Sequence, residues 1–240
     1  MPIKRPPLIN NEIYHVIIRG VGDSLIFNNK EDRYRAIFSL YEFNTDEPVE
    51  ISVQRRKRRN KIKGEQFSFN FGNSEKRNLL VEILAFCFMP NHIHLLLKQV
   101  QDDGITKFMR KFGAGYATYF NKKYNRKGHL FQGRFKAVHI EDTNQLQTVF
   151  VYIHTNPISL IDTHWKDGNI NDSSQAINFL ENYRWSSYLD YLGKKNFPSI
   201  TKRNIFQEII GDKEDIQEFV NDWVKYQTAI TEDNTTIGLE

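Results

Sequence analysis

The chain of 240 residues is long enough for one large domain or for a domain with an appendage, and its 40% hydrophobic and 26% charged residues are ordinary for a globular protein. No stretch approaches the roughly 20 apolar residues that span a membrane, and the first residues do not form a signal peptide. The single cysteine, Cys87, excludes an internal disulfide and fits a reducing compartment, so we expect a cytoplasmic protein that does not contact membranes.

The net charge of +4 is distributed unevenly along the chain. Residues 197–240 carry 4 Lys and Arg against 9 Asp and Glu, a net charge of −5, which leaves 29 basic and 20 acidic residues, a net charge of +9, in the first 196. A basic body with an acidic C-terminal region makes a polyanion such as nucleic acid the first partner to consider. A solvated surface is the alternative, because charge alone does not identify a ligand.

Two elements are predicted near the N-terminus. Residues 14–20 form a short apolar run that ends at a glycine, which is typical of a strand. Residues 30–43 carry apolar side chains three, four and seven positions apart, so we expect an amphipathic helix there. Asn28 or Asn29 is placed to cap its first turn.

Residues 44–78 differ from their surroundings, because seven of the nine residues from 55 to 63 are basic. Such a block repels itself and is typical of a loop or arm inserted between packed elements. A merely solvated loop and a loop that contacts DNA phosphates are both open interpretations. The second would involve four arginines: Arg55, Arg56, Arg58 and Arg59.

A β-hairpin is predicted next, with a buried strand at residues 79–88, a Met-Pro-Asn turn at residues 89–91 and a second strand at residues 92–100. Residues two apart on a strand face the same side, so His92 and His94 would project together. Two neighbouring imidazoles can supply two ligands to a metal ion. The alternative is one histidine in the core and one exposed to solvent.

Residues 104–124 carry aromatic side chains at helical spacing, and we expect most of these side chains to be buried in the core. Residues 128–135 are predicted to form an ordered turn with glycine at two positions. No acidic residue occurs from Gly104 to Ile140. Basic and aromatic residues mixed over this length favour a groove for DNA. The candidate DNA-binding residues are Lys107, Arg110, Lys111, Lys122, Lys123, Arg126, Lys127, Arg134 and Lys136.

A further helix is predicted to start at Asp142 or Thr143 and to end before Pro157. Its buried stripe leaves Tyr152 and Asn156 side by side on its flank, one turn apart. Residues 185–192 are expected to pack on the domain, and residues 205–226 to form an acidic helical segment.

These residues together suggest phosphodiester chemistry. His92, His94 and the amide oxygen of Asn156 would suit Mg²⁺ or Mn²⁺, although ligand preference alone leaves zinc open. The metal would polarise a phosphate oxygen, and Tyr152 would be the nucleophile. Among the helical tyrosines considered, only Tyr152 has an oxygen ligand four residues later, but a buried structural tyrosine is a serious alternative.

Four motifs, which occur in a fixed order along the chain, carry a resemblance to a known protein family. They are Pro90-Asn91-His92-Ile93-His94-Leu95-Leu96, Gly128-His129-Leu130-Phe131-Gln132-Gly133-Arg134-Phe135-Lys136, Tyr152-Ile153-His154-Thr155-Asn156-Pro157 and Trp185-Ser186-Ser187-Tyr188. The chain resembles the REP-associated tyrosine transposases, a branch of the single-tyrosine HUH, or IS200-like, transposases. The resemblance implies a ferredoxin-like α+β fold whose central antiparallel sheet carries the histidine pair. It also implies cleavage and joining of single-stranded or hairpin DNA through a covalent 5′-phosphotyrosine, with a divalent metal.

Residue by residue, His92 and His94 match the metal-binding pair of this family, Tyr152 the nucleophile and Asn156 the polar residue one turn later. We expect a catalytic domain at residues 1–196, interrupted by the basic insertion at about 44–78, then an acidic helical appendage at 197–228 and a disordered tail at 229–240. The insertion and the appendage depart from the family pattern.

Two alternative functions remain. One is a non-cleaving DNA-binding protein of the same fold, against which the intact set of four site residues argues. The other is a rolling-circle replication initiator or relaxase, which the motif order and the single tyrosine disfavour. The sequence leaves open the DNA recognised and whether the protein is a monomer or a homodimer.

Overall fold

The computed structural model describes residues 6–51, 53–54, 77–163, 165 and 170–229. The arginines predicted to contact DNA in the basic insertion, Arg55, Arg56, Arg58 and Arg59, and the predicted tail beyond Ala229 lie outside the described residues. Within the described part, no helix combines the length and the apolar character needed to cross a membrane.

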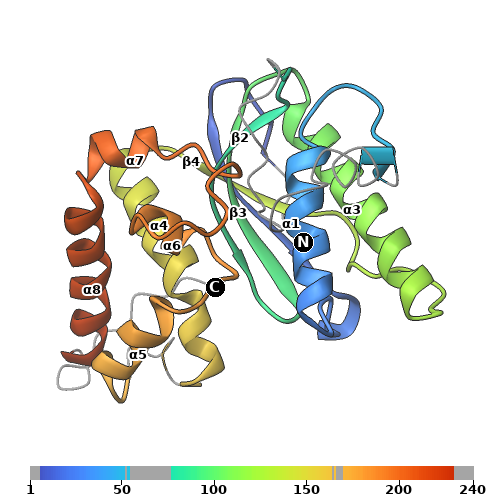
Figure 1. Ribbon diagram of the computed structural model, residues 1–240. Coiled ribbons are helices and arrows are strands. Elements are labelled where there is room, and N and C mark those ends of the chain that lie inside the picture. The colour runs from blue at the N-terminus through green and yellow to red at the C-terminus, as the bar shows by residue number, and fades with distance from the viewer. Residues whose placement is uncertain (1–5, 52, 55–76, 164, 166–169, 230–240) are drawn as a thin grey trace, which may run out of the picture.

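The centre of the protein is a four-stranded antiparallel sheet with the strand order β2-β3-β1-β4 (Figure 1). The chain runs in the order β1 (Ile13–Arg19), α1 (Lys30–Glu42), β2 (Val81–Phe88), β3 (His92–Gln99), α3 (Gly104–Lys123) and β4 (Lys136–Ile140). Two strand–helix–strand units with β1 and β3 in the middle of the sheet define the ferredoxin-like arrangement. The predicted α+β fold is confirmed.

Local capping explains where the helices begin. The Asn29 side chain accepts a hydrogen bond from the backbone N–H of Asp32, and the Asp32 carboxylate accepts from the backbone N–H of Asn29, so a capping box starts α1. Asp142 accepts from the N–H of Gln145 at the start of α4 (Thr143–Thr155). The predicted N-terminal caps of both helices are therefore confirmed.

Strand β4 was not predicted. Its five residues are too few for the alternation of buried and exposed side chains to stand out from the sequence around them. It lies at the edge of the sheet and pairs only with β1, from Ile13 opposite Ile140 to Ile17 opposite Lys136. The short helix α5 (Ser173–Leu180) was missed as well.

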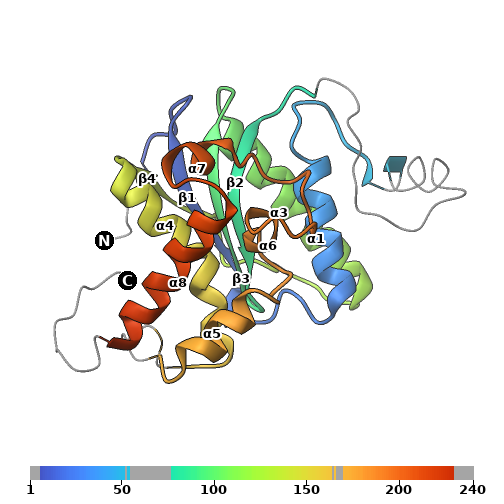
Figure 2. The same cartoon turned by 60° about the vertical axis from the view of Figure 1, so that its left-hand side comes forward.

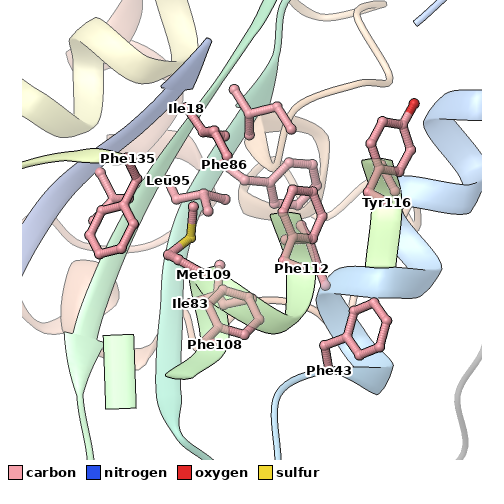
Figure 3. Packing of buried hydrophobic residues seen from close by; sticks show 14 of the residues in the cluster. Ile18, Phe43, Ile83, Phe86, Leu95, Phe108, Met109, Phe112, Tyr116 and Phe135 are labelled. Carbon is pink, nitrogen blue, oxygen red and sulfur yellow. The ribbon is translucent and has the colours of Figure 1, made fainter. Parts of the chain in front are cut away.

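Each face of the sheet is covered by its own hydrophobic core. Helices α1 and α3 lie on one face, where alternate residues of β1 and β3, including Ile18 and Leu95, meet Phe112 and Tyr116 of α3 (Figure 3). The Tyr116 hydroxyl donates to the carbonyl of Ile26, which satisfies the one polar group of that side chain in this core.

The opposite face is covered by α4, with α5 and the C-terminal helices behind it (Figure 1). The acidic segment predicted at 205–226 is two helices, α7 (Asn204–Ile209) and α8 (Lys213–Ala229). Between them lies Gly211, whose φ of 128° favours glycine. The ring of Phe206 in α7 lies 4.1 Å from that of Phe150 in α4, so these helices support the back of α4 (Figure 2).

Candidate active site

The face of the sheet beneath α4 carries both histidines of the predicted pair. His92 and His94 point to this face of β3, while Ile93 and Leu95 point into the core on the other side. In the antiparallel pairing of β3 with β1, Arg19 lies opposite His92 and Ile17 opposite His94. Two central strands therefore build the floor of the site.

His92 is oriented by its neighbour in the turn. Its Nδ1 lies 2.6 Å from Oδ1 of Asn91. An amide oxygen only accepts hydrogen bonds, so the proton of the neutral imidazole is on Nδ1 and the lone pair is on Nε2. This is the tautomer that a histidine uses when Nε2 coordinates a metal.

A third histidine, His15 of β1, completes the floor and was not predicted as a site residue. Its Nε2 lies 3.0 Å from Nδ1 of His94, and the two rings are stacked with centroids 5.2 Å apart. Burial lowers the pKa of His15 to about 4, so this imidazole is neutral at pH 7. Alternation along the predicted strand places His15 on one face with Ile17 and Arg19, but the sequence does not show that β1 lies beside β3.

The opposite wall of the site is formed by Tyr152 of α4. The centroid of its ring lies 5.5 Å from that of His94 and 6.0 Å from that of His15, and both contacts are edge-on. Trp165 stacks against its other side with centroids 6.1 Å apart. The fold thus brings Tyr152 to the histidine pair, from which it is separated by nearly 60 residues of sequence.

The Tyr152 hydroxyl is in a partly buried polar setting. Burial raises its pKa, while a hydrogen bond with the side chain of Asn156 and the positive charge of Arg19 oppose that rise. The net pKa is above the ordinary value, so the phenol keeps its proton at neutral pH. Asn156 is itself buried at the C-cap of α4, and its backbone N–H donates to the carbonyl of Tyr152.

The donors around Tyr152 fit a divalent metal. Among the described residues, no group of three or more His, Cys, Asp or Glu side chains is arranged to hold a metal ion. Two imidazoles and one amide oxygen, from His92, His94 and Asn156, are nevertheless a suitable partial set for Mg²⁺ or Mn²⁺. Both histidines engage Nδ1 in a hydrogen bond, the orientation typical of metal-ligating histidines.

Several of the basic residues predicted to bind DNA are engaged within the protein. Lys107 donates to the carbonyl of Asp102, and Lys111 donates to that of Glu47. Both belong to α3, which covers the face of the sheet opposite α4 (Figure 1). Lys123 forms an ion pair with Asp32 at 2.6 Å.

Other basic residues are nearer the site or exposed. Lys136 of β4 is paired with Ile17 of β1, which is paired with His94 of β3. The Cα atoms of Lys136 and His94 are therefore about 10 Å apart. The predicted turn at residues 128–135, which contains Arg134, is ordered: the N–H of Gln132 donates to the carbonyl of Arg19 at 2.8 Å. Arg126 hydrogen-bonds to Asn121, and the exposed members of the set, apart from the ion-paired Lys123, are Arg110, Lys122, Lys127, Arg134 and Lys136.

Comparison with known protein families finds one matching family model. The family model described as Transposase IS200 like matches residues 50–156, a region that includes His92, His94, Tyr152 and Asn156. No curated protein matches the chain significantly.

Two solved structures resemble the chain distantly. One is a REP-associated tyrosine transposase bound to a REP hairpin, with 16% identity, a TM-score of 0.47 and coverage of 84% of this chain and 94% of that chain. The other is the tRNA(His) guanylyltransferase of Saccharomyces cerevisiae, with 13% identity, a TM-score of 0.33 and coverage of 86% and 79%. Neither similarity is close enough to assign a function.

Proposed function

We propose that this chain is a metal-dependent endonuclease and strand transferase that cuts and rejoins single-stranded or hairpin DNA, because residues 50–156 match the family model described as Transposase IS200 like. The observation that carries the proposal is the position of Tyr152, whose ring packs edge-on against His94 and whose hydroxyl meets Asn156. The contacts therefore run from His92 to His94, from His94 to Tyr152 and from Tyr152 to Asn156, so these four groups are neighbours.

The reaction is a displacement at phosphorus. A bond forms between Oη of Tyr152 and the phosphorus atom, and the bond from phosphorus to the 3′ oxygen of the preceding nucleotide breaks. The phenol loses its proton to solvent, and the leaving oxygen takes up a proton to become a 3′-hydroxyl. The product is a 5′-phosphotyrosine that retains the energy of the phosphodiester, so a 3′-hydroxyl can later attack it and restore a DNA strand.

The chain's own residues have distinct roles in this step. The elevated pKa of Tyr152 means that the phenol needs a partner that stabilises its anion, and Asn156 and Arg19 are placed to do so. His92, His94 and Asn156 would hold the metal, which supplies Lewis acidity to a phosphate oxygen. Lys136 on β4 adds a second positive charge beside that of Arg19 on β1.

The non-cleaving DNA-binding protein is the second candidate, and one experiment separates it from the transposase. The DNA that flanks the gene is searched for short imperfect palindromes, and these are labelled as single-stranded hairpins and incubated with the protein and Mn²⁺. The proposal expects a protein–DNA adduct that survives SDS and a new 3′-hydroxyl end. Binding without any adduct, in Mn²⁺ and in Mg²⁺, would favour the binding protein.

The metal ligands give a direct prediction. His92→Ala or His94→Ala should reduce adduct formation by at least about 100-fold, as should chelation of the metal, because the phosphate loses its Lewis acid. DNA binding measured in EDTA should stay within about threefold of the wild type. The matched control is His139→Ala. His139 is on β4, away from the site, and its Nε2 lies 2.8 Å from a carboxylate oxygen of Glu12. Normal cleavage by both site variants would contradict the metal site.

Arg19→Ala should slow adduct formation about 10- to 100-fold, because the positive charge of Arg19 acts on the Tyr152 hydroxyl and would stabilise its anion. Arg19 now pairs with Asp23 at 2.9 Å, with 45% and 63% of the two side chains exposed. Such an exposed pair is weak, so a phosphate can displace Asp23. Rates are measured in single turnover with Lys225→Ala as the control, since Lys225 is an exposed cation on α8 outside the candidate DNA-binding set. Equal rates for the two variants would remove Arg19 from the mechanism.

A further inference from the structure

The contact between His15 and His94 has no role in the proposed reaction. His15 also lies outside residues 50–156, which the family model matches. The two rings come from different strands, lie nearly parallel at an interplanar angle of 20°, and are joined through Nε2 of His15 and Nδ1 of His94. Both side chains are buried, with 8% and 2% exposed. A shared hydrogen bond in such a setting fixes both rings.

The direction of this hydrogen bond decides which nitrogen of His94 can coordinate a metal. If His15 donated, Nδ1 of a neutral His94 would be the acceptor, its proton would be on Nε2, and Nε2 would have no lone pair for a metal. If His94 donates from Nδ1, Nε2 holds the lone pair. His92 already has this second arrangement through Asn91.

We propose that His15 is a positioning residue for the metal centre: its Nε2 accepts the Nδ1 proton of His94 and so holds Nε2 of His94 as a metal ligand. This inference rests on the proposed metal-dependent function. His15 does not itself ligate the metal, because the nitrogen nearest the pair is already occupied by His94. Its role corresponds to that of Asn91, so each histidine of the pair has one partner that fixes its tautomer.

The competing explanation is that His15 only fills space in the core. Two substitutions distinguish this packing role from the positioning of His94. In His15→Gln the amide oxygen can still accept the proton of His94, whereas His15→Leu retains much of the side-chain volume but cannot accept a hydrogen bond. If His15 acted only through packing, Leu would be tolerated at least as well as Gln.

The test is Mn²⁺ binding to the full-length protein without DNA, measured by calorimetry. His15→Leu should weaken binding about 10- to 100-fold, as is typical when a partner of a metal ligand is lost. His15→Gln and the control His139→Gln should stay within about threefold of the wild type. Urea unfolding of each variant reports whether the fold is retained.

Wild-type affinity in His15→Leu, or a loss as large in His15→Gln as in His15→Leu, would overturn the positioning role while leaving the proposed function intact. A wild-type protein that neither binds Mn²⁺ nor forms the DNA adduct would overturn both. The tautomer can also be read without a variant. Long-range ¹⁵N–¹H NMR of the wild type should find the proton of His94 on Nδ1, and a proton on Nε2 would contradict the inference.

Discussion

Tyr152→Phe is expected to reduce the covalent protein–DNA adduct by more than about 1,000-fold, to below detection, because the substitution removes the only atom that the proposal allows to attack phosphorus. The ring itself remains, so its contacts with His94, His15 and Trp165 are preserved. Hairpin binding and the free energy of unfolding should therefore change little. Adduct is measured on denaturing gels and binding by a filter assay.

Tyr226→Phe is the matched control for that prediction. Tyr226 is on α8 and 63% of it is exposed, so loss of its hydroxyl should leave the adduct unchanged. An adduct that persists in Tyr152→Phe would show that another residue is the nucleophile.

Asp32→Ala is expected to lower the free energy of unfolding by about 3 kcal/mol, the largest effect on stability that we predict. The carboxylate is fully buried where the start of α1 meets the end of α3. It accepts hydrogen bonds from Lys123 at 2.6 Å, Tyr124 at 2.7 Å and Tyr119 at 2.9 Å, and it closes the capping box of α1. The substitution removes the acceptor for all of these donors at once.

The measurement is urea unfolding, with Asp23→Ala as the control. Asp23 is also in an ion pair, but it is exposed, so its loss should cost less than about 1 kcal/mol. Equal losses in the two variants would show that the network around Asp32 contributes no special stability.

The pH dependence of stability gives this prediction a second measurable consequence. Burial by itself would raise the pKa of Asp32, but hydrogen bonds from Lys123, Tyr124, the N–H of Asn28 and Tyr119 more than offset it, so the pKa is lowered. A carboxylate with a lowered folded pKa contributes its full stability above the unfolded value of about 3.9 and loses it as the pH falls through the folded pKa. Below pH 4, wild-type stability should fall more steeply than that of Asp32→Ala.

Local sequence signals were sufficient for the parts of the fold that depend on neighbours in the chain. The sequence narrowed the start of α1 to Asn28 or Asn29 and that of α4 to Asp142 or Thr143, because a cap and the backbone N–H that it satisfies are three residues apart. In the structure Asn29 and Asp142 are the caps. Tyr152 and Asn156 were placed on one flank of α4 by helical periodicity alone. In both cases the relevant partner lies within one helical turn.

Features that depend on which strands are neighbours could not be predicted in the same way. His15 and His94 are 79 residues apart, and only the order β2-β3-β1-β4 brings them together. The same limit applies to the charges of α3. Lys107 and Lys111 belong to an acid-free basic stretch of sequence, yet the fold places them on the side of the sheet opposite Tyr152.

The most direct test of the central claim is to identify the residue that carries the DNA. The adduct formed with the labelled hairpin in Mn²⁺ is digested with nuclease and protease, and the modified peptide is sequenced by mass spectrometry. We predict a nucleotide joined through its 5′-phosphate to Tyr152. Attachment to any other residue, or through a 3′-phosphate, would contradict the proposed site.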